Sequence, residues 1–320
     1  MANIITVTFN PAIDKISSVP VLIPEKKLQC SAPVFEAGGG GVNVSRAIKK
    51  LGGNSVAFYL AGGHTGKLFT QMLLEEHVES IVTETQGYTR ENLIVLETAS
   101  NQQYRFGMPG PHIAEGEWQD CLKNINHMPG VEWIVASGSL PPGVPTDIFA
   151  RIARIARQKN ARLIVDTSGD ALYQAVQEGV YMVKPNLGEL STLTGTEERH
   201  IKSVDEVARQ VIARGKCEVM VVSMGPTGAM LVTKDLVKQI IPPPVKIKST
   251  VGAGDCMVAG IVLQLAGNKS LTEAVQYGVA CGTAATMNPG TQLCSKEDVE
   301  LLYRLIQEKS APRIWPLEIR

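Results

Sequence analysis

The sequence predicts a doubly wound α/β fold, with a central, mostly parallel β-sheet covered by helices on both faces and a small separate β-sheet. Strand-like and helix-like runs alternate along most of the 320 residues, which is the pattern of successive βαβ units. The runs 163–165 and 219–222 are apolar at every position, as expected of strands that are buried on both faces. Hydrophobic residues make up 44% of the chain, enough for one large core.

The first half of the chain supplies strands of the main sheet and the helices between them. A β-branched run at 4–9 opens the first strand, which ends at Asn10-Pro11. Glycine is common just past a helix, so Gly52 ends a helix at 42–51. Thr146 is predicted to cap a helix whose apolar residues recur on one face. The further strands are expected at 54–60, 133–137 and 162–166.

The same alternation continues to the carboxyl end. The expected elements are helices at 171–178 and 204–214, strands at 181–184, 219–223 and 229–233, and three closing helices at 253–266, 271–287 and 296–308. The last helix begins at Ser295 with a sequence close to a capping box. The segment 310–320 lies beyond it.

Two segments, 12–35 and about 88–108, do not follow the alternation, because they contain strand-like runs without intervening helices. The second reads as a hairpin that turns at Ser100-Asn101. We therefore expect one domain over residues 1–320 with a small β appendage formed by these two distant pieces.

Composition excludes several classes of protein. The chain has 31 Lys and Arg against 31 Asp and Glu, and this neutral balance argues against a nucleic-acid-binding protein. No apolar stretch reaches the length of a membrane helix and no signal peptide is recognisable, so a cytoplasmic location is expected. The five histidines lack metal-ligand spacing. The six cysteines form no Cys-x-x-Cys pair and are expected to be buried small hydrophobic residues in a reducing compartment: Cys30, Cys121, Cys217, Cys256, Cys281 and Cys294.

Four consecutive glycines, 38–41, stand directly before a predicted helix. Without Cβ atoms, the chain allows a ligand with hydroxyl or anionic groups to approach the backbone amides. A flexible loop is the alternative, but Asn43 and Arg46 in the first turns of the helix favour a binding site. The spacing does not match a dinucleotide-binding fingerprint.

A second glycine-bearing segment, Gly252-Ala253-Gly254-Asp255, opens another helix. Amides converge there on the positive end of the helix dipole, which suits a transferring phosphoryl group. Asp255 in the first turn could take the proton of an acceptor hydroxyl. The alternative is that Asp255 is simply a favourable acid at a helix amino terminus.

Two weaker signals follow buried strands. Asn186 and Glu189 are three residues apart and could order Mg²⁺ through water. The turn at 223–228 could flank a nucleotide or be only a tight turn. The segment 62–68 is rejected as a nucleotide loop, because it is one residue short and has Leu where Ser or Thr must hold magnesium.

Taken together and in this order, the segments resemble those of the ribokinase-like sugar kinases, over nearly the whole chain. The resemblance is carried by 8–14, the glycine run, Asn186-x-x-Glu189, 252–255 and 288–291. Within that family the chain resembles the phosphofructokinase branch, and most of all its minor bacterial 6-phosphofructokinase group, through 137–143, 104–106 and 242–246. The resemblance implies a doubly wound domain whose β appendage is a lid that clasps the lid of a second subunit in a homodimer.

The resemblance also implies roles for individual residues. Asp255 would be the catalytic base, and the amides of Gly252, Ala253 and Gly254 the anion hole. Sugar hydroxyls would meet Asp14, Gly39, Gly40, Asn43 and Ser139, and the sugar phosphate would meet Arg90, Lys27 and Arg105; Lys27 could come from the partner subunit. ATP would lie against Lys184, Asn186, Ser223, Gly225, Gly228, Val279 and Thr283. Glu189 would organise Mg²⁺, and carbonyl groups of Ser249, Val251, Ala285, Asn288 and Gly290 resemble the family's monovalent-cation site, which suggests K⁺.

The expected reaction is ATP-dependent phosphorylation of fructose 6-phosphate at its 1-hydroxyl. Many relatives that act on fructose 1-phosphate or tagatose 6-phosphate carry Lys within the glycine run, and this chain has glycine at all four positions. Those two substrates remain alternatives, because few pocket side chains separate them. A non-catalytic sugar-phosphate sensor is a more remote one. Gln292 stands where the minor bacterial 6-phosphofructokinases carry Arg. A cation bound by backbone oxygens there would tolerate this difference.

Overall fold

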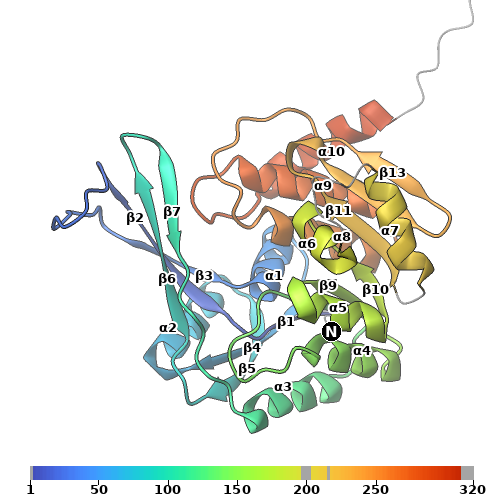
Figure 1. Cartoon of the computed structure of the whole chain (residues 1–320), viewed down its shortest axis with the longest axis horizontal. Coiled ribbons are helices and arrows are strands. Elements are labelled where there is room, and N and C mark those ends of the chain that lie inside the picture. Colours follow the sequence, from blue (N-terminus) through green and yellow to red (C-terminus); the bar gives the residue numbers. More distant parts are fainter. Residues whose placement is uncertain (1–2, 196–202, 215–216, 311–320) are drawn as a thin grey trace, which may run out of the picture.

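The computed structural model describes residues 3–195, 203–214 and 217–310. It contains a nine-stranded sheet and a separate four-stranded sheet (Figure 1). In order across the large sheet, its strands are β13 (Val237–Ile240), β12 (Ala229–Thr233), β11 (Cys217–Ser223), β10 (Val180–Val183), β9 (Arg162–Asp166), β8 (Trp133–Ser137), β1 (Ile4–Thr8), β4 (Val56–Gly62) and β5 (Glu79–Thr85).

The large sheet is parallel from β5 to β11 and antiparallel beyond it, where β12 pairs with both β11 and β13. Two large hydrophobic clusters lie against it, one on each face, and a third, smaller cluster lies against β4. One large cluster takes residues from α3 (Glu115–His127), α4 (Ile148–Gln158), α5 (Gly169–Glu178), α6 (Leu187–Thr194) and α7 (Val204–Ala213). The other large cluster takes residues from α1 (Gly40–Lys50), α8 (Ala253–Ala266), α9 (Leu271–Thr286) and α10 (Lys296–Ser310). The predicted doubly wound architecture is therefore confirmed.

The small sheet is formed by the two segments that broke the alternation. Its order is β3 (Val34–Gly38), β2 (Ala12–Val19), β6 (Arg90–Glu97) and β7 (Gln102–Phe106). The central pair β2 and β6 is parallel, and the outer pairs are antiparallel. Figure 1 shows this sheet standing off from the α/β body, with the loop between β2 and β3 at its far end.

Several details differ from the predictions. Thr146 does not cap α4; the residue before the helix is Asp147, whose carboxylate pairs with Arg151 one turn later at 3.0 Å. Four elements of the main body were not predicted at all: α2 (Gly63–Glu75), α3, α6 and β13, together with edge strand β5. Cys30 is exposed, contrary to expectation, while the other five cysteines are buried and all six are free.

The carboxyl ends of the parallel strands bring polar residues to one edge of the large sheet. β8 ends at Ser137, β9 at Asp166, β10 leads into Lys184 and β11 ends at Ser223. Ligands of open α/β sheets bind in the crevice at this edge. In the described part of the chain, no helix is long and apolar enough to cross a membrane.

Candidate active site

Asp255 lies in the first turn of α8, where the chain enters the helix through a left-handed residue. Gly252 has φ 73° and precedes the helix, a conformation that favours glycine. The carboxylate faces α1 across the site, and its Oδ2 accepts a hydrogen bond of 2.9 Å from Nδ2 of Asn43. The two motifs that the sequence singled out, 212 residues apart, therefore meet.

The surroundings of Asp255 make it a suitable base. Burial, and after it the charge of nearby Asp166, raise its pKa to about 7, against the bond from Asn43 and the cations Lys184 and Arg46, which lower it. A pKa near the working pH serves a general base well, because the ionised form is populated and still binds a proton effectively.

Lys184 and Asp166 form a buried ion pair beneath the start of α8. Lys184 Nζ lies 3.2 Å from Asp166 Oδ1, with 6% and 13% of the side chains exposed. A Cβ atom on Gly254 would lie only 3.4 Å from that ammonium group. Burial disfavours the charge of Lys184, but Asp166, with Glu189 and Asp255, outweighs it and raises the pKa of the ammonium. A permanent cation therefore sits directly behind the predicted anion hole.

Asn186 and Glu189 form a capping box at the start of α6. The Glu189 amide donates to Oδ1 of Asn186 at 2.8 Å, and the Asn186 amide donates to Oε2 of Glu189 at the same distance. Burial raises the pKa of Glu189, as does Asp166, whereas the bond from Asn186 lowers it. The described residues contain no cluster of three or more His, Cys, Asp or Glu side chains arranged to hold a metal. The carboxylate of Glu189 is a hard oxygen ligand and fits Mg²⁺ held mainly through water.

A cavity of about 630 Å³ opens beside the start of α8. It lies between the turn after β11, the segment 241–247 and helices α8 and α9. Of the residues predicted to bind the nucleotide or phosphoryl group, it is lined by Ser223, Gly225, Gly228, Ala253, Gly254, Val279 and Thr283. Lys184 and Asn186 do not line it, but Asn186 pairs with Ser223 in an isolated parallel bridge.

The glycine run lies between the small sheet and the large one. A Cβ on Gly38 would lie 2.6 Å from Oδ2 of Asp14, and one on Gly40 would lie 2.2 Å from the Ser137 hydroxyl. Asp14 Oδ1 accepts a 2.8 Å bond from Asn92 of β6. Burial raises the pKa of Asp14, against the Asn92 bond and the charge of Arg90.

Arg90, Asn10 and Ser139 form a third part of the site. Asn10 Nδ2 donates to the Ser139 hydroxyl at 3.1 Å, and Arg90 donates at 3.0 Å to the backbone oxygens of Asn10 and Met108. Asn10 Oδ1 and Arg90 Nε are buried and, among the described residues, lack hydrogen-bond partners. Buried polar groups are nearly always paired, so these two point to a ligand or water.

The structure does not bring Lys27 to this site. Lys27 is exposed in the loop between β2 and β3, at the far end of the small sheet (Figure 1). Arg105 lies on β7 and donates to Gln103 at 3.3 Å. Arg105 pairs with Ile94 of β6, and Asp14 pairs with Asn92 of the same strand β6. Because Ile94 and Asn92 are two residues apart, they point to the same face of the sheet, so Arg105 shares the face of Asp14.

The segments predicted to hold a monovalent cation are neighbours. Ser249 donates from its hydroxyl to the carbonyl oxygen of Gly290 at 2.6 Å, and its amide donates to Thr286. Asn288 donates from its side chain to the Leu293 carbonyl at 2.9 Å. Two adjacent loops rich in backbone carbonyl groups fit a cation that prefers oxygen ligands.

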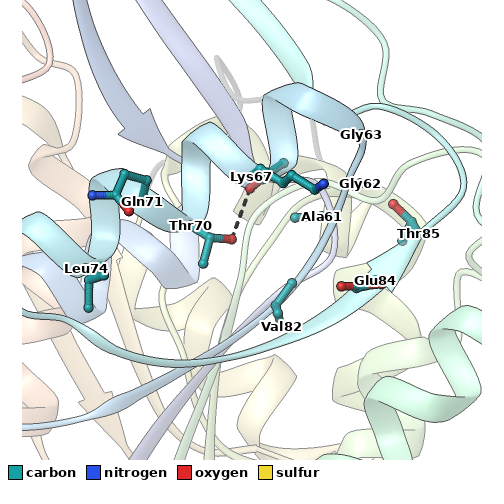
Figure 2. Close-up of a pocket in the computed structure, with 11 residues that line it drawn as sticks. Ala61, Gly62, Gly63, Lys67, Thr70, Gln71, Leu74, Val82, Glu84 and Thr85 are labelled. Carbon is teal, nitrogen blue, oxygen red and sulfur yellow. Dashed lines mark hydrogen bonds between the residues drawn. The ribbon is translucent and has the colours of Figure 1, made fainter.

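The rejected phosphate-loop-like segment begins α2 in another part of the molecule. It lines a pocket of about 310 Å³ between α2 and strand β5 (Figure 2). Figure 2 shows Lys67 and Thr70 on the helix side and Glu84 and Thr85 on the strand side. This pocket shares no lining residue with the cavity beside α8.

Three residues of the site were missing from the sequence-based assignment: Asp166, Asn10 and Asn92. Asp166 carried a usable signal, because it is an acid at the carboxyl end of a buried parallel strand. Asn10 stands within segment 8–14, where the sequence marks it only as the end of a strand. Asn92 becomes visible only through the pairing of β2 with β6, which places it opposite Asp14.

Comparison with known proteins agrees with this geometry. The chain is 44% identical to the ATP-dependent 6-phosphofructokinase isozyme 2 of Escherichia coli over 95% of this chain and 98% of that protein. It is 32% identical to the 1-phosphofructokinase of Bacillus subtilis, over 97% and 100%. A crystal structure of Escherichia coli phosphofructokinase-2 in complex with potassium matches with a TM-score of 0.91 at 43% identity, covering 96% of this chain and 100% of the other. Residues 7–298 match the model of the pfkB family carbohydrate kinases, and the chain belongs to that family.

Proposed function

We propose that the protein is an ATP-dependent kinase that phosphorylates fructose 6-phosphate at its 1-hydroxyl to give fructose 1,6-bisphosphate. One observation carries this proposal. Asp255, in the first turn of α8, accepts a bond from Asn43 of the helix that follows the glycine run, and its neighbours Ala253 and Gly254 border the 630 Å³ cavity. A base in that position faces a sugar on one side and a phosphoryl donor on the other. The relative at 44% identity is named for this reaction.

In the proposed reaction, the 1-hydroxyl loses its proton to Asp255 while its oxygen bonds to the γ-phosphorus of ATP and the bond to the ADP oxygen breaks. The amides of Gly252 to Gly254 and the ammonium of Lys184 stabilise the charge on the transferring group. Asp255 must be ionised to act, so turnover is expected to fall as the pH drops below about 7.

Mg²⁺, held through water by Glu189 and by the phosphates, would neutralise charge on the phosphate oxygens. Support for this assignment comes from the donor set: the carboxylate of Glu189 lies close to Asp166 and Lys184. Carbonyl groups of Ser249, Val251, Ala285, Asn288 and Gly290 are proposed to hold K⁺. The adjacency of their two loops supports this, and so does the potassium complex of the similar Escherichia coli protein.

The sugar is proposed to lie against Asp14, Gly39, Gly40, Asn43 and Ser139, with its phosphate near Arg90. The unpaired Nε of Arg90 and Oδ1 of Asn10 support a polar ligand here. Lysine in the glycine run would need space that the fold does not offer at Gly40, where a Cβ would also lie 2.8 Å from the Gly138 nitrogen. This supports fructose 6-phosphate over the substrates of relatives with that lysine.

Residues 1–320 are proposed to form one kinase domain whose small sheet is a lid, and the lids of two subunits are proposed to pack together. Phe35, Leu93 and Phe106 lie in one cross-strand row of this sheet, through the register with Lys15. Phe35 and Phe106 are 42% and 45% exposed. Large exposed aromatic residues in one row mark an interaction surface. A partner lid would bring its own Lys27 toward the sugar phosphate.

The test is ADP release with MgATP and each of fructose 6-phosphate, tagatose 6-phosphate and fructose 1-phosphate, with Asp255→Asn as the matched variant. We expect the highest kcat/KM for fructose 6-phosphate and a loss of about 10²–10⁴-fold in kcat for the variant. Preference for another sugar would overturn the substrate assignment and keep the base. Near-normal turnover by Asp255→Asn would overturn the base, and sugar binding without any turnover would indicate a sensor.

A further inference from the structure

Arg46 is a buried cation where α1, β3 and the end of α2 meet near the site. It lies on α1 with 5% of its side chain exposed. Its Nε and Nη2 donate to the two carboxylate oxygens of Glu76 at 2.8 and 2.6 Å. Its Nη1 donates to the backbone oxygen of Ala37 in β3 and, at 3.3 Å, to Oδ1 of Asn43. A buried ion pair is weak evidence for stability, so these four bonds point to a role in the site.

The bond from Arg46 decides which end of the Asn43 amide faces the base. The oxygen and nitrogen ends of an amide have nearly the same shape but opposite hydrogen-bonding character. Because Arg46 is a donor only, it binds Oδ1 and turns the NH₂ group toward Asp255. Nδ2 of Asn43 then donates to Oδ2 of Asp255 at 2.9 Å, so Oδ1 of Asp255 is the oxygen to which we assign the proton.

We propose that Arg46, clamped by Glu76, is a positioning residue for the phosphoryl transfer. It holds the Asn43 amide toward Asp255 and ties that contact to Ala37, which leads directly into the glycine run. The inference rests on the proposed function, since it takes Asp255 as the base. Arg46 touches neither substrate in this arrangement and acts through Asn43.

Charge gives Arg46 a second, measurable effect on the base. The charged groups that face Asp255 are Asp166 of β9, Lys184 after β10 and Arg46 of α1. Burial and then Asp166 raise the pKa of Asp255, whereas Asn43, Lys184 and Arg46 lower it. Removing the cation at position 46 should therefore raise this pKa above about 7. If the pKa of Asp255 rose from 7 to 8, the ionised fraction of its carboxyl group at pH 7 would fall about fivefold.

Three variants separate charge from geometry. Arg46→Met removes both, Arg46→Lys keeps the charge but loses the planar fork that can bind Glu76 and Asn43 together, and Glu75→Gln is the control. Glu75 is the exposed neighbour of Glu76 on the same helix and accepts a bond from Gln71. Each full-length protein is compared with the wild type in kcat and sugar KM from pH 5.5 to 9, in thermal midpoint, and in the ¹³C titration of the Asp255 carboxyl without substrate. The Asp255 signal is assigned by its loss in Asp255→Asn.

We expect Arg46→Met to move the acid limb of kcat and the ¹³C titration of Asp255 to higher pH, with kcat still reduced at pH 9. Arg46→Lys should keep the limb near the wild-type pH and lower kcat at every pH, with sugar KM changed less than kcat. Glu75→Gln should match the wild type in every measurement.

An unmoved titration in folded Arg46→Met, or unchanged kcat at pH 9 in both Arg46 variants, would overturn the inference. If Arg46→Met does not fold, Arg46→Lys decides: wild-type kcat in that variant would overturn the positioning role. Failure of the proposed function is recognised separately, by absence of turnover in the wild type or by turnover in Asp255→Asn. In that case the substrate-free titration still tests whether Arg46 lowers the pKa of Asp255.

Discussion

At the scale of single residues, the glycine run is determined by protein packing as much as by the ligand. The sequence indicated that four missing side chains would let a substrate approach the backbone. In the structure, a Cβ at Gly41 would also lie 2.5 Å from the Val7 carbonyl oxygen, and one at Gly40 would lie 2.2 Å from the Ser137 hydroxyl. Real Cβ atoms do not make such contacts, so α1 can approach β1 and β8 this closely only through glycine.

Gly40→Ala tests this packing. The added methyl group must displace Ser137 and Gly138 next to the proposed sugar contact Ser139, so we expect a loss of about 1–3 kcal/mol in unfolding free energy together with a marked loss of kcat/KM. The control is Gly116→Ala on helix α3, where an added Cβ meets nothing within 4 Å. That change should leave activity intact and stabilise the fold slightly. Equal stability and activity in both variants, measured by urea unfolding and sugar kinetics, would contradict the packing argument.

Individual side chains were predictable from the sequence where their motif is contiguous and less so where their partner is distant. Asp255, Glu189 and the glycine run each stand in a short segment with its own physical reason. Arg46 was noticed beside the glycine run, but its partner Glu76 is 30 residues away. The pairing of such residues depends on how α1 and α2 pack, and no local pattern reports that.

At the scale of elements, one short helix combines a structural and a chemical task. α6 begins with the Asn186–Glu189 capping box, so the proposed metal-organising carboxylate is fixed by the same bonds that start the helix. α9 begins with an equivalent box, Ser270–Glu273, away from the site. The two helices therefore allow the capping function to be separated from the chemistry.

Asn186→Ala and Ser270→Ala are the matched pair. Each removes one side-chain cap, so each should cost about 0.5–2 kcal/mol in unfolding free energy. In Asn186→Ala, Glu189 loses one of its fixed positions, and KM for MgATP should rise several-fold while the Mg²⁺ requirement increases. Ser270→Ala should keep the wild-type kinetics. If denaturant melts show equal losses but both variants retain the wild-type KM, Glu189 does not organise the metal through this box.

The elements missed in the sequence have identifiable reasons. α2 starts at Gly63 without a polar cap, and its exposed Leu68 and Leu74 blur the apolar stripe formed by Phe69 and Leu73. α3 has only three buried residues at helical spacing, Trp118, Cys121 and Ile125, and they stand among polar residues. β13 has four residues, of which only Ile240 is buried, so only its pairing with β12 identifies it.

At the scale of the whole molecule, the two sheets divide the work. The large sheet supplies Lys184, Asp166 and the turn beside the nucleotide cavity, whereas the small sheet supplies Asp14 and Arg90. Each of the two segments that form the small sheet begins and ends at the main body: β2 and β3 lie between β1 and α1, and β6 and β7 lie between β5 and α3. Any movement of the small sheet therefore changes the sugar side of the site. The sequence predicted the appendage because its strands lacked helices; it could not predict the parallel pairing of β2 with β6.

The proposed packing of two lids can be tested by the double change Phe35→Asp and Phe106→Asp. Two carboxylates in the aromatic row should prevent lid association, so sedimentation should shift from a dimer to a monomer. Sugar KM should rise with it if the partner supplies a phosphate contact. Lys27→Ala serves as the control, because it should raise sugar KM without changing the sedimenting mass. A wild-type protein that sediments as a monomer would contradict the proposed assembly.

The exposed thiol of Cys30 makes the lid directly observable. The other five cysteines are buried, so a maleimide dye added to the native protein should attach at one place, in the loop between β2 and β3. A fluorophore there would be attached to the outer end of the small sheet, away from the α/β body in Figure 1. The natural sequence thus already contains a single labelling point from which energy transfer between subunits, or from a fluorescent nucleotide, can be followed in real time.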